Sequence, residues 1–600
     1  MTTSDDVSSE GGGDLLTVAV VRTWVVLAME LLTAARPVIN EANVFPVADS
    51  DTGTNLCLTL GDGRDALDAL GATAGLDEAL RALARGALMG ARGNSGIILS
   101  EYLRGFALGI AGRAGAGGAS AAAVVAGLVE ASRCAYDAVG RPREGTILTA
   151  ATGAARAAAH ALEAHSARVA PGAPSPVVGL HHVVDVARAG AQVALERSVK
   201  ELDVLAAAGV LDAGAYGLVL ILDALGLSLD AASASVVSEA AGRITIMDSL
   251  AVADAVTHPA DAQVAHAHAG VAQADHTASD GEFEVMFVVG HVGADRQEID
   301  TIASTLRERL IQVGDSVVVV GGADESAAAE SAETNGTWQV HVHTDHPLAA
   351  LRVADGWSQR QIVVRSLPNQ VAARAHGAQP PHGVVACIAS PGLVTDLARS
   401  GAVVVLRGTA PIGRDDLRRG ALETTAARVT LVPADASTVR QALELAGSVL
   451  PGHGLLPGMD VVESVSDLHV VAAMSAWATS QGPGAGEPDT GGAAVPVPVP
   501  VPVPAPSLRL AGMRTAVLAV RAVTVDGSDP AALRAGLAEI LADVRDGPAA
   551  VLTMLVGDLV PVQVTDDLAV AAARRCPGIE IVVLSSGRRS ASLVMGVDEQ

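Results

Sequence analysis

The chain has 600 residues, half of them hydrophobic, a length that predicts roughly three to five domains, each able to bury a core. Charged residues make up 18% and aromatic residues 2% of this composition, which excludes collagen-like and wholly disordered classes. The formal net charge is −26 and no basic stripe is present, so we expect no nucleic-acid binding, because an acidic surface repels phosphate backbones.

The four cysteines stand far apart without CxxC spacing, which is typical of a reducing cytoplasm and not of a disulfide scaffold. The best membrane candidate, residues 15–35, contains Arg22 and Glu30 and is amphipathic, so we expect no transmembrane segment. The first ten residues are acidic and polar, unlike a signal peptide. The sequence therefore predicts a cytoplasmic protein, and its bias toward Arg, Ala, Gly and Val indicates a GC-rich bacterial genome.

Residues 14–227 are predicted to form an all-helical domain, because Ala- and Leu-rich stretches alternate with Gly-rich turns. Locally connected helices that bury their own faces should fold as an independent unit. Residues 228–277 are weakly periodic, and we expect a linker there with one short strand near 242–247. The clearest expected helices cover residues 76–88, 119–138, 147–165 and 181–205.

The rest of the chain alternates between strands and helices. Residues 278–376 are predicted to form a small α+β domain, and residues 383–481 and 508–600 an α/β region with parallel strands and crossover helices. Residues 482–507 split that region with repeated Val-Pro, which favours an extended spacer over a packed element. Expected strands are 282–291, 315–320, 337–344, 384–390, 403–408, 429–435, 515–525, 549–556 and 579–584; expected helices are 298–313, 393–401, 437–447, 530–544 and 565–576.

The most informative stretch is Asn43-Val-Phe-Pro-Val-Ala-Asp49-Ser-Asp51-Thr-Gly-Thr-Asn55. Its carboxylates, Asp49 and Asp51, stand in a loop of turn-forming residues and can present oxygen ligands to one Mg²⁺. The residues from Gly53 to Asn55 open a helix, so free amides and the helix dipole point toward the same place. This combination predicts a phosphate site; on this stretch alone, an Asx-turn cap on a surface loop is an equal alternative.

A second glycine-rich loop, residues 90–96, repeats this device ahead of an apolar helix. Gly93 and Gly96 allow close backbone approach, while Asn94 and Ser95 can donate to phosphate oxygens. An ordinary helix N-cap is the alternative, but two such loops in one helical domain favour a nucleotide.

The chain's one lysine, Lys200, lies in no GxxxxGK[ST] or VAIK pattern, which excludes P-loop enzymes and protein kinases. The phosphates of a bound ATP would then be held by a metal ion, by backbone amides and by Arg92.

Four ordered blocks resemble the DhaL-type ATP-binding domain of dihydroxyacetone kinase, and more closely the version in the ATP-binding subunit of bacterial fatty acid kinase. They are NVFPVADSDTGTN from Asn43, GARGNSGIILSEYLRGF from Gly90, EGTILT from Glu144 and GVLDAGAYGL from Gly209. VHVHTDHP, from Val340, resembles that family's middle domain, and the two C-terminal strand–helix units resemble its last domain.

The resemblance implies an all-helical barrel of antiparallel helices with Mg-ATP at one end. Asp49 and Asp51 match the metal-binding aspartates, and Asn43 stands near the place of a third one in dihydroxyacetone kinases. Ser50 replaces the usual glycine between the aspartates, which costs about 1 kcal/mol if that position needs a positive φ. The residues matching nucleotide-contacting blocks are Thr52, Gly53, Thr54, Asn55, Gly93, Asn94, Ser95, Gly96, Thr146 and Asp212.

The middle domain offers a second candidate metal site. His341 and His343 face the same side of a predicted strand, and paired imidazoles can bind zinc. In relatives a cysteine lies on the neighbouring strand, where Glu284 stands here. A zinc site of these three residues is chemically reasonable, and surface histidines on a polar strand face are an equal alternative.

The resemblance implies an ATP-dependent kinase that phosphorylates a fatty acid carboxylate, presented by a DegV-like fatty-acid-binding protein, in fatty acid metabolism and phospholipid synthesis. We also expect a homodimer, with the middle and C-terminal domains as docking or dimerisation surfaces. A nucleotide-binding regulatory protein without catalysis is an alternative, suggested by Ser50, the missing cysteine and an altered loop at residues 408–413. A dihydroxyacetone-type (glycerone) kinase component is a third possibility.

Overall fold

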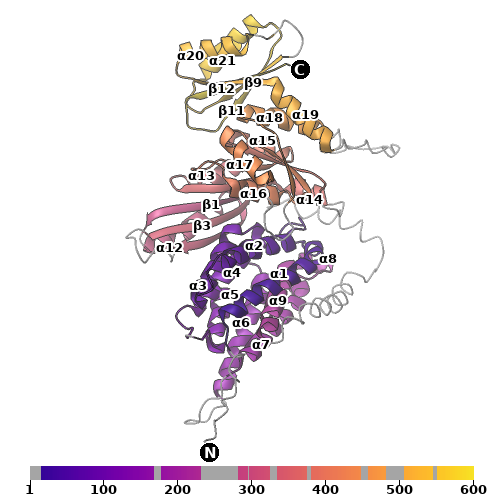
Figure 1. The fold of residues 1–600 in the computed structure, drawn as a ribbon, viewed down its shortest axis with the longest axis vertical. Helices are drawn as coiled ribbons and strands as arrows, with labels where there is room; N and C mark the ends of the chain where they lie inside the picture. The colour runs from indigo at the N-terminus through magenta and orange to yellow at the C-terminus, as the bar shows by residue number, and fades with distance from the viewer. Residues whose placement is uncertain are drawn as a thin grey trace, which may run out of the picture. The chain divides into compact units, whose positions relative to one another are not determined.

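The computed structural model describes residues 15–115, 117–167, 178–230, 281–294, 296–323, 334–374, 380–447, 457–480, 506–542, 544 and 550–599. The chain forms two compact units (Figure 1). The first combines Met1–Asp280 with His291–His343, and the second combines Gly281–Gly290 with Thr344–Gln600. The first unit is thus larger than the predicted helical domain.

The first unit begins with a ring of helices (Figure 1). Helices adjacent in sequence pack side by side from α1 to α7, α7 contacts α9, and α9 returns to α1, which closes the ring as expected for an all-helical barrel. The bounds are α1 Val18–Glu41, α2 Thr52–Asp68, α3 Leu76–Gly90, α4 Gly93–Ile110, α5 Ala121–Ala138, α6 Ile147–Ala167, α7 Leu180–Glu201, α8 Asp203–Ala208 and α9 Ala213–Leu229.

Small residues let these helices approach closely. A Cβ added at Gly153 of α6 would lie 2.6 Å from the backbone oxygen of Gly190 on α7, so only glycine fits this crossing. Helix starts follow the sequence as well: the Thr17 hydroxyl accepts from the Val20 amide, and the Ser120 hydroxyl caps α5. Local capping and small-residue packing therefore explain why this Ala- and Gly-rich segment forms a helical ring.

Helix α1 is, in the described part of the chain, the one helix long and apolar enough to cross a membrane by length and composition. A core helix of a soluble protein meets the same criterion, and half of the apolar window of α1 is buried. The indole of Trp24 donates to the Ile221 carbonyl of α9 at 2.8 Å and meets the Phe106 ring edge-on at 5.7 Å. The contacts of α1 are thus those of a bundle helix.

The first unit also contains α12 (Arg296–Leu310), β2 (Asp315–Ala323) and β3 (Thr334–Thr344, of which Thr344 falls in the second unit). β2 and β3 pair antiparallel, with Val318 opposite His341 and Val320 opposite Gln339. Residues 317–320 of β2 are all buried, because α12 contacts this strand and α4 and α5 contact it as well. A continuous valine run is the expected composition of a strand covered on both faces.

The second unit contains most of β1 and a sheet in the order β1-β4-β6-β5-β7-β8. β4 runs antiparallel to β1 and β6, whereas β5, β6, β7 and β8 are mutually parallel, as the strand–helix alternation predicts. The elements are β1 Phe283–Ala294, α13 Pro347–Arg352, β4 Ser358–Ser366, α14 Leu367–Arg374, β5 Gly383–Ile388, η1 Pro391–Leu393, α15 Val394–Arg399, β6 Val403–Leu406, α16 Arg414–Glu423, β7 Arg428–Val432, α17 Ala436–Gly447, β8 Gly458–Val461 and α18 Asp467–Thr479.

The C-terminal part of this unit has a second sheet in the order β11-β10-β12-β9. β10 and β11 are parallel, and β12 is antiparallel to both of its neighbours, so this sheet is mixed. Its elements are α19 Pro506–Ala519, β9 Val520–Asp526, α20 Pro530–Ile540, β10 Ala550–Val556, α21 Val562–Arg575, β11 Glu580–Ser585 and β12 Ser592–Glu599.

Several expected boundaries were wrong. The helix expected over 181–205 ends at Glu201, and a separate helix α8 follows, closed by Gly209 in the left-handed conformation (φ +69°). The strand expected over 515–525 begins only at Val520, because α19 extends through Ala519 and starts at Pro506, within the predicted spacer. The strand expected near 242–247, residues 231–277 and residues 482–505 lie outside the described residues.

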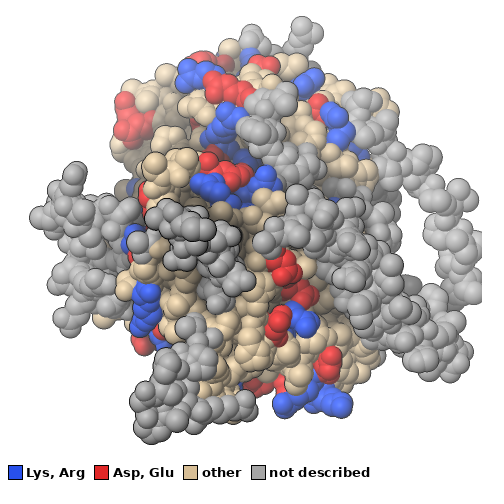
Figure 2. All heavy atoms as spheres, turned by 60° about the horizontal axis from the view of Figure 1, so that its bottom comes forward, with Lys and Arg blue, Asp and Glu red and all other residues tan. Residues whose placement is uncertain are grey.

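Surface charges are balanced locally. On the face shown in Figure 2, basic and acidic side chains alternate in small groups. The exposed Arg133 pairs with both Glu130 and Asp137, and Arg22 pairs with Asp68. Exposed pairs of this kind contribute about 0–1 kcal/mol each, so they shape the surface more than they stabilise the fold.

Candidate phosphate-binding site

The aspartate loop connects α1 to α2 and is almost fully buried. Asp49 is 9% exposed and Asp51 4% exposed, and a cis peptide bond joins Phe45 to Pro46 earlier in the loop. The Asn43 amide donates to Asp49 Oδ1 at 2.6 Å, while Asn43 Oδ1 accepts from the Thr52 hydroxyl at 2.9 Å. Asn43 therefore orients Asp49, and its own oxygen already serves as an acceptor.

Ser50 stands between the aspartates in the left-handed conformation, with φ at +51°. The position that is usually glycine thus does require a positive φ, and serine adopts it at a cost of about 1 kcal/mol. This backbone turn lies directly between two carboxylates, so the local strain serves the shape of the aspartate loop.

The second loop leads into α4 and lies against α2. Gly93 has φ at +56°, and a Cβ there would come within 2.2 Å of the Asn55 amide nitrogen. A Cβ at Gly96 would lie 2.3 Å from the Thr59 hydroxyl. Both glycines are therefore required by close approach to α2, as well as by the backbone conformation at Gly93.

The two loops meet through their side chains. The hydroxyl oxygens of Thr52 and Ser95 lie 3.3 Å apart, which joins the first turn of α2 to the first turn of α4. Neither helix has a side-chain cap at its N-terminus, so amides of both first turns remain available. Two helix dipoles and a pair of buried carboxylates thus converge on one place, an arrangement suited to a metal–phosphate complex.

Two further groups support a ligand at this place. The buried amide oxygen of Asn94 has no hydrogen-bond partner among the described residues, an unusual state that a bound ligand would relieve. Asn40, at the end of α1, holds Thr54 by donating to its hydroxyl at 3.1 Å and accepting from its amide at 3.1 Å. The sequence prediction missed Asn40, because nothing local marks an exposed-looking asparagine at a helix end as a support.

Arg92 has a different role from the predicted one. Its side chain is 2% exposed, and its guanidinium pairs with Asp62 at 3.1 Å and donates to the Gly90 carbonyl at 2.8 Å. The Arg92 amide donates to the Thr59 hydroxyl at 3.3 Å. Arg92 therefore ties the glycine loop to α2, and this side chain is held by protein groups instead of pointing at the phosphate site.

Thr146 and Asp212 form a second cluster, where the N-termini of α6 and α9 meet. Asp212 Oδ1 caps α9 by accepting from the Ala215 amide at 2.7 Å, and the carboxylate also accepts from the amide of Ile147, the first residue of α6. Thr146 donates its hydroxyl to the Arg143 carbonyl at 2.8 Å. The two predicted blocks are thus joined by a shared helix cap.

Burial raises the pKa of Asp212 from 3.8 to about 6, although three backbone amides act in the opposite direction. The folded state therefore binds this proton more tightly than the unfolded state does. Its stabilising contribution is complete below pH 3.8 and is lost as the pH rises from 3.8 to about 6.

We expect Asp212→Asn to stabilise the protein at pH 7.5 by up to about 3 kcal/mol, because asparagine keeps the capping oxygen without a buried charge. The gain should shrink as the pH approaches 4. Urea unfolding at pH 7.5 and pH 4.5 measures both effects, with the exposed Asp203→Asn as control. A gain independent of pH would show that the charge of Asp212 is not the cause.

The predicted zinc ligands are all buried, so the alternative of surface histidines is wrong. In the first unit, the Nε2 atoms of His341 and His343 lie 3.1 Å apart on β3. In the second unit, the Glu284 carboxylate accepts from the guanidinium of Arg365, which also pairs with Glu423 at 3.2 Å. The Glu284 charge is thus neutralised by an arginine, and zinc at these residues remains a prediction.

Comparison with known proteins places the two motif-bearing regions. Residues 46–227 match the DAK2 domain, and residues 280–374 match the FakA-like middle domain of fatty acid kinase. Protein YloV of Bacillus subtilis is 28% identical over 449 residues, which cover 72% of this chain and 72% of that protein. An uncharacterized protein of Staphylococcus epidermidis is 36% identical over 185 residues, 31% of each chain.

Among solved structures, the dihydroxyacetone kinase from C. freundii in complex with AMP-PNP and Mg²⁺ is 18% identical and covers 38% of this chain and 37% of that chain. Its TM-score of 0.26 is too low to support a statement about this protein.

The matched domains define the chain as a kinase-family protein with a DAK2 domain. A DAK2 domain followed by this particular middle domain makes it a FakA-like protein of the fatty acid kinase family, as the four sequence blocks predict.

Proposed function

We propose that this protein transfers the γ-phosphoryl group of ATP to the carboxylate of a fatty acid, giving an acyl phosphate and ADP. The observation that supports this most is the convergence of two uncapped helix N-termini, α2 and α4, on the buried carboxylates of Asp49 and Asp51. Such a site suits a magnesium-bound polyphosphate, because amides and metal together balance its charge.

The residues present fit Mg²⁺ and ATP. Asp49 and Asp51 supply the oxygen ligands that Mg²⁺ prefers, and the unpartnered Asn94 oxygen lies in the same loop system. Mg²⁺ held there would neutralise phosphate charge. The amides of the first turns of α2 and α4 would orient the phosphates, and Thr52 and Ser95 would donate to phosphate oxygens.

A carboxylate acceptor makes the chemistry simple. A carboxylate oxygen forms the new bond to the γ-phosphorus, and the bond to the β–γ bridging oxygen breaks, leaving its electron pair on ADP. No proton moves, since the acceptor is already ionised at neutral pH. A hydroxyl acceptor such as dihydroxyacetone would require a general base.

We further propose that a DegV-like fatty-acid-binding protein presents the acyl chain in the cytoplasm, in fatty acid metabolism leading to phospholipids. The strand-containing regions after the helical ring hold sheets and helices that can serve as docking or homodimer surfaces.

The test is to incubate the full chain with Mg-ATP, oleate or palmitate, and each DegV-like protein of its genome, and to trap acyl phosphate with hydroxylamine. We expect product only when ATP, fatty acid and carrier are all present. Phosphorylation of dihydroxyacetone without acyl phosphate would show that the acceptor is wrong, and nucleotide binding without any transfer would favour a regulatory protein.

A further inference from the structure

The glycine loop between α3 and α4 has a back wall, and that wall comes from a segment more than two hundred residues away in sequence. Ala91 and Ile97, on either side of the loop, are fully buried. They form one apolar cluster with Ala138 of α5 and with Val318 and Val320 of β2. The loop therefore lies between α2 in front and β2 behind.

A polar contact reinforces this wall. The side-chain amide of Gln339, on β3 and 1% exposed, donates to the Ala91 carbonyl at 3.4 Å. Gln339 pairs with Val320 in the β2–β3 register, so the contact belongs to the same strand pair as the apolar cluster. Ala91 immediately precedes Arg92, the N-cap residue of α4, so this bond acts on the backbone that sets the loop's position.

The same strand also fixes the turn after α5. Val139 forms an isolated antiparallel bridge with Val318, and the Gly140 amide donates to the Val317 carbonyl at 3.0 Å. β2 is thereby bonded to the segment that leads toward the Glu144–Thr149 block. One strand pair thus contacts the chain at two points near predicted nucleotide-facing residues.

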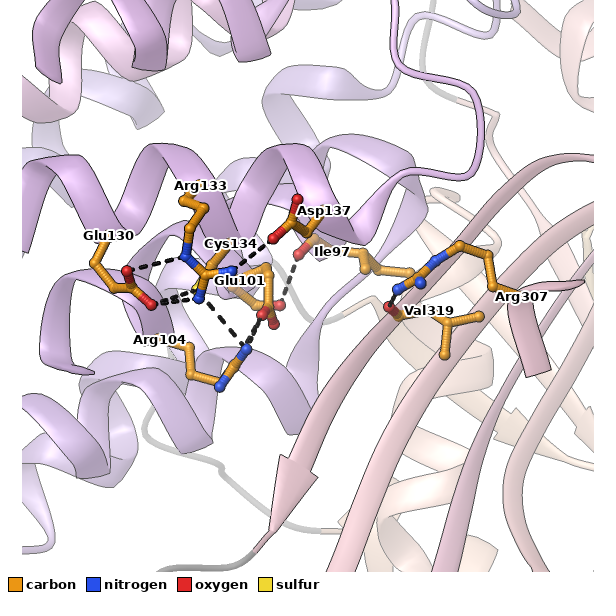
Figure 3. A network of polar contacts seen from close by, with 10 residues as sticks. Ile97, Glu101, Arg104, Glu130, Arg133, Cys134, Asp137, Arg307 and Val319 are labelled. Carbon is orange, nitrogen blue, oxygen red and sulfur yellow. Dashed lines mark hydrogen bonds and ion pairs between the residues drawn. The ribbon is translucent and has the colours of Figure 1, made fainter. Parts of the chain in front are cut away.

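Charged groups follow the same boundary. Arg307 of α12 donates to the Val319 carbonyl at 3.1 Å, opposite the α4–α5 network of Glu101, Arg104 and Arg133 (Figure 3). Burial lowers the pKa of Arg307, while Glu101 and Asp137 raise it. An arginine whose field is set by acids on α4 and α5 shows that α12 and β2 are packed as part of the helical ring.

We propose that β2 and β3 hold the glycine loop in its phosphate-binding position and that Gln339 is a positioning residue for the nucleotide. This inference rests on the proposed nucleotide site. It assigns to residues of the middle-domain region a role in nucleotide binding, in addition to any part in docking a carrier. Neither Gln339 nor Val318 touches the phosphates; both act through the loop backbone.

The test uses full-length variants and the affinity for Mg-ADP measured by calorimetry. Gln339→Leu keeps the side-chain volume but removes the donor, and Val318→Ala opens the apolar cluster. Each should weaken Mg-ADP binding roughly three- to tenfold and raise the KM for ATP by a similar factor, in line with the loss of one buried contact. Val318→Ala decides the question if Gln339→Leu does not fold.

The matched control is Val340→Ala. Val340 is fully buried next to Gln339, but it faces the opposite side of β3, so its loss destabilises the same strand without touching the loop. We expect a lower melting temperature and a dissociation constant within about twofold of the wild type. Equal weakening by Val340→Ala, or unchanged binding by both other variants, would overturn the inference. A wild-type protein that does not bind Mg-ADP would instead refute the nucleotide site itself.

Discussion

Replacing Asp49 or Asp51 by asparagine should reduce ATP-dependent phosphoryl transfer at least about a hundredfold while the helical ring stays folded. Both side chains lie in the loop between α1 and α2, and neither contributes to the apolar core. Asparagine preserves their size and one oxygen but removes the charge that a divalent cation needs. Steady-state assays at saturating Mg-ATP, together with circular dichroism, measure the two effects.

Asp65→Asn is the matched control for this experiment. Asp65 is an exposed carboxylate on α2, so its loss changes the net charge by the same amount at a distance from the loop. Activity close to wild type is expected for Asp65→Asn. Near-normal turnover of either loop variant would show that the aspartate loop does not bind the metal.

Replacing Gly93 by alanine should abolish measurable nucleotide binding. A methyl group there would come within 2.2 Å of the Asn55 amide nitrogen, at a backbone conformation (φ +56°) that alanine adopts only with strain. The loop must then shift away from α2, which would separate Ser95 from Thr52. A fall in Mg-ADP affinity beyond about a hundredfold is the expected result of displacing a whole phosphate loop.

Gly71→Ala is the appropriate comparison, because nothing lies within 4 Å of a Cβ added at that position. It should bind Mg-ADP like the wild type and be slightly more stable, since alanine restricts the unfolded chain. If Gly93→Ala retained wild-type affinity, the loop would not be the phosphate-binding element.

Local patterns in the sequence were sufficient for the helical ring and for the two loops of the site. Capping residues, apolar periodicity and the glycines at 93 and 96 all act over a few residues, and the structure places them as predicted. The positive φ of Ser50 could also be anticipated, because the aspartates on both sides require a tight turn there.

The environment of each loop could not be predicted, because it depends on contacts between distant segments. Arg92 was expected at the phosphates, yet it pairs with Asp62, 30 residues earlier. Gln339 reaches Ala91 across 248 residues of sequence. Periodicity tells which face of an element is apolar, but it does not tell which other surface covers that face.

The position of β2 in the chain has a consequence for the order in which the protein matures. Synthesis proceeds from the N-terminus, so the helical ring leaves the ribosome well before Val318, Val320 and Gln339 do. Until those residues arrive, Ala91, Ile97 and Ala138 lack the strand that covers them in the finished structure. The growing chain should therefore acquire its full affinity for nucleotide only late in translation, after β3 has been made.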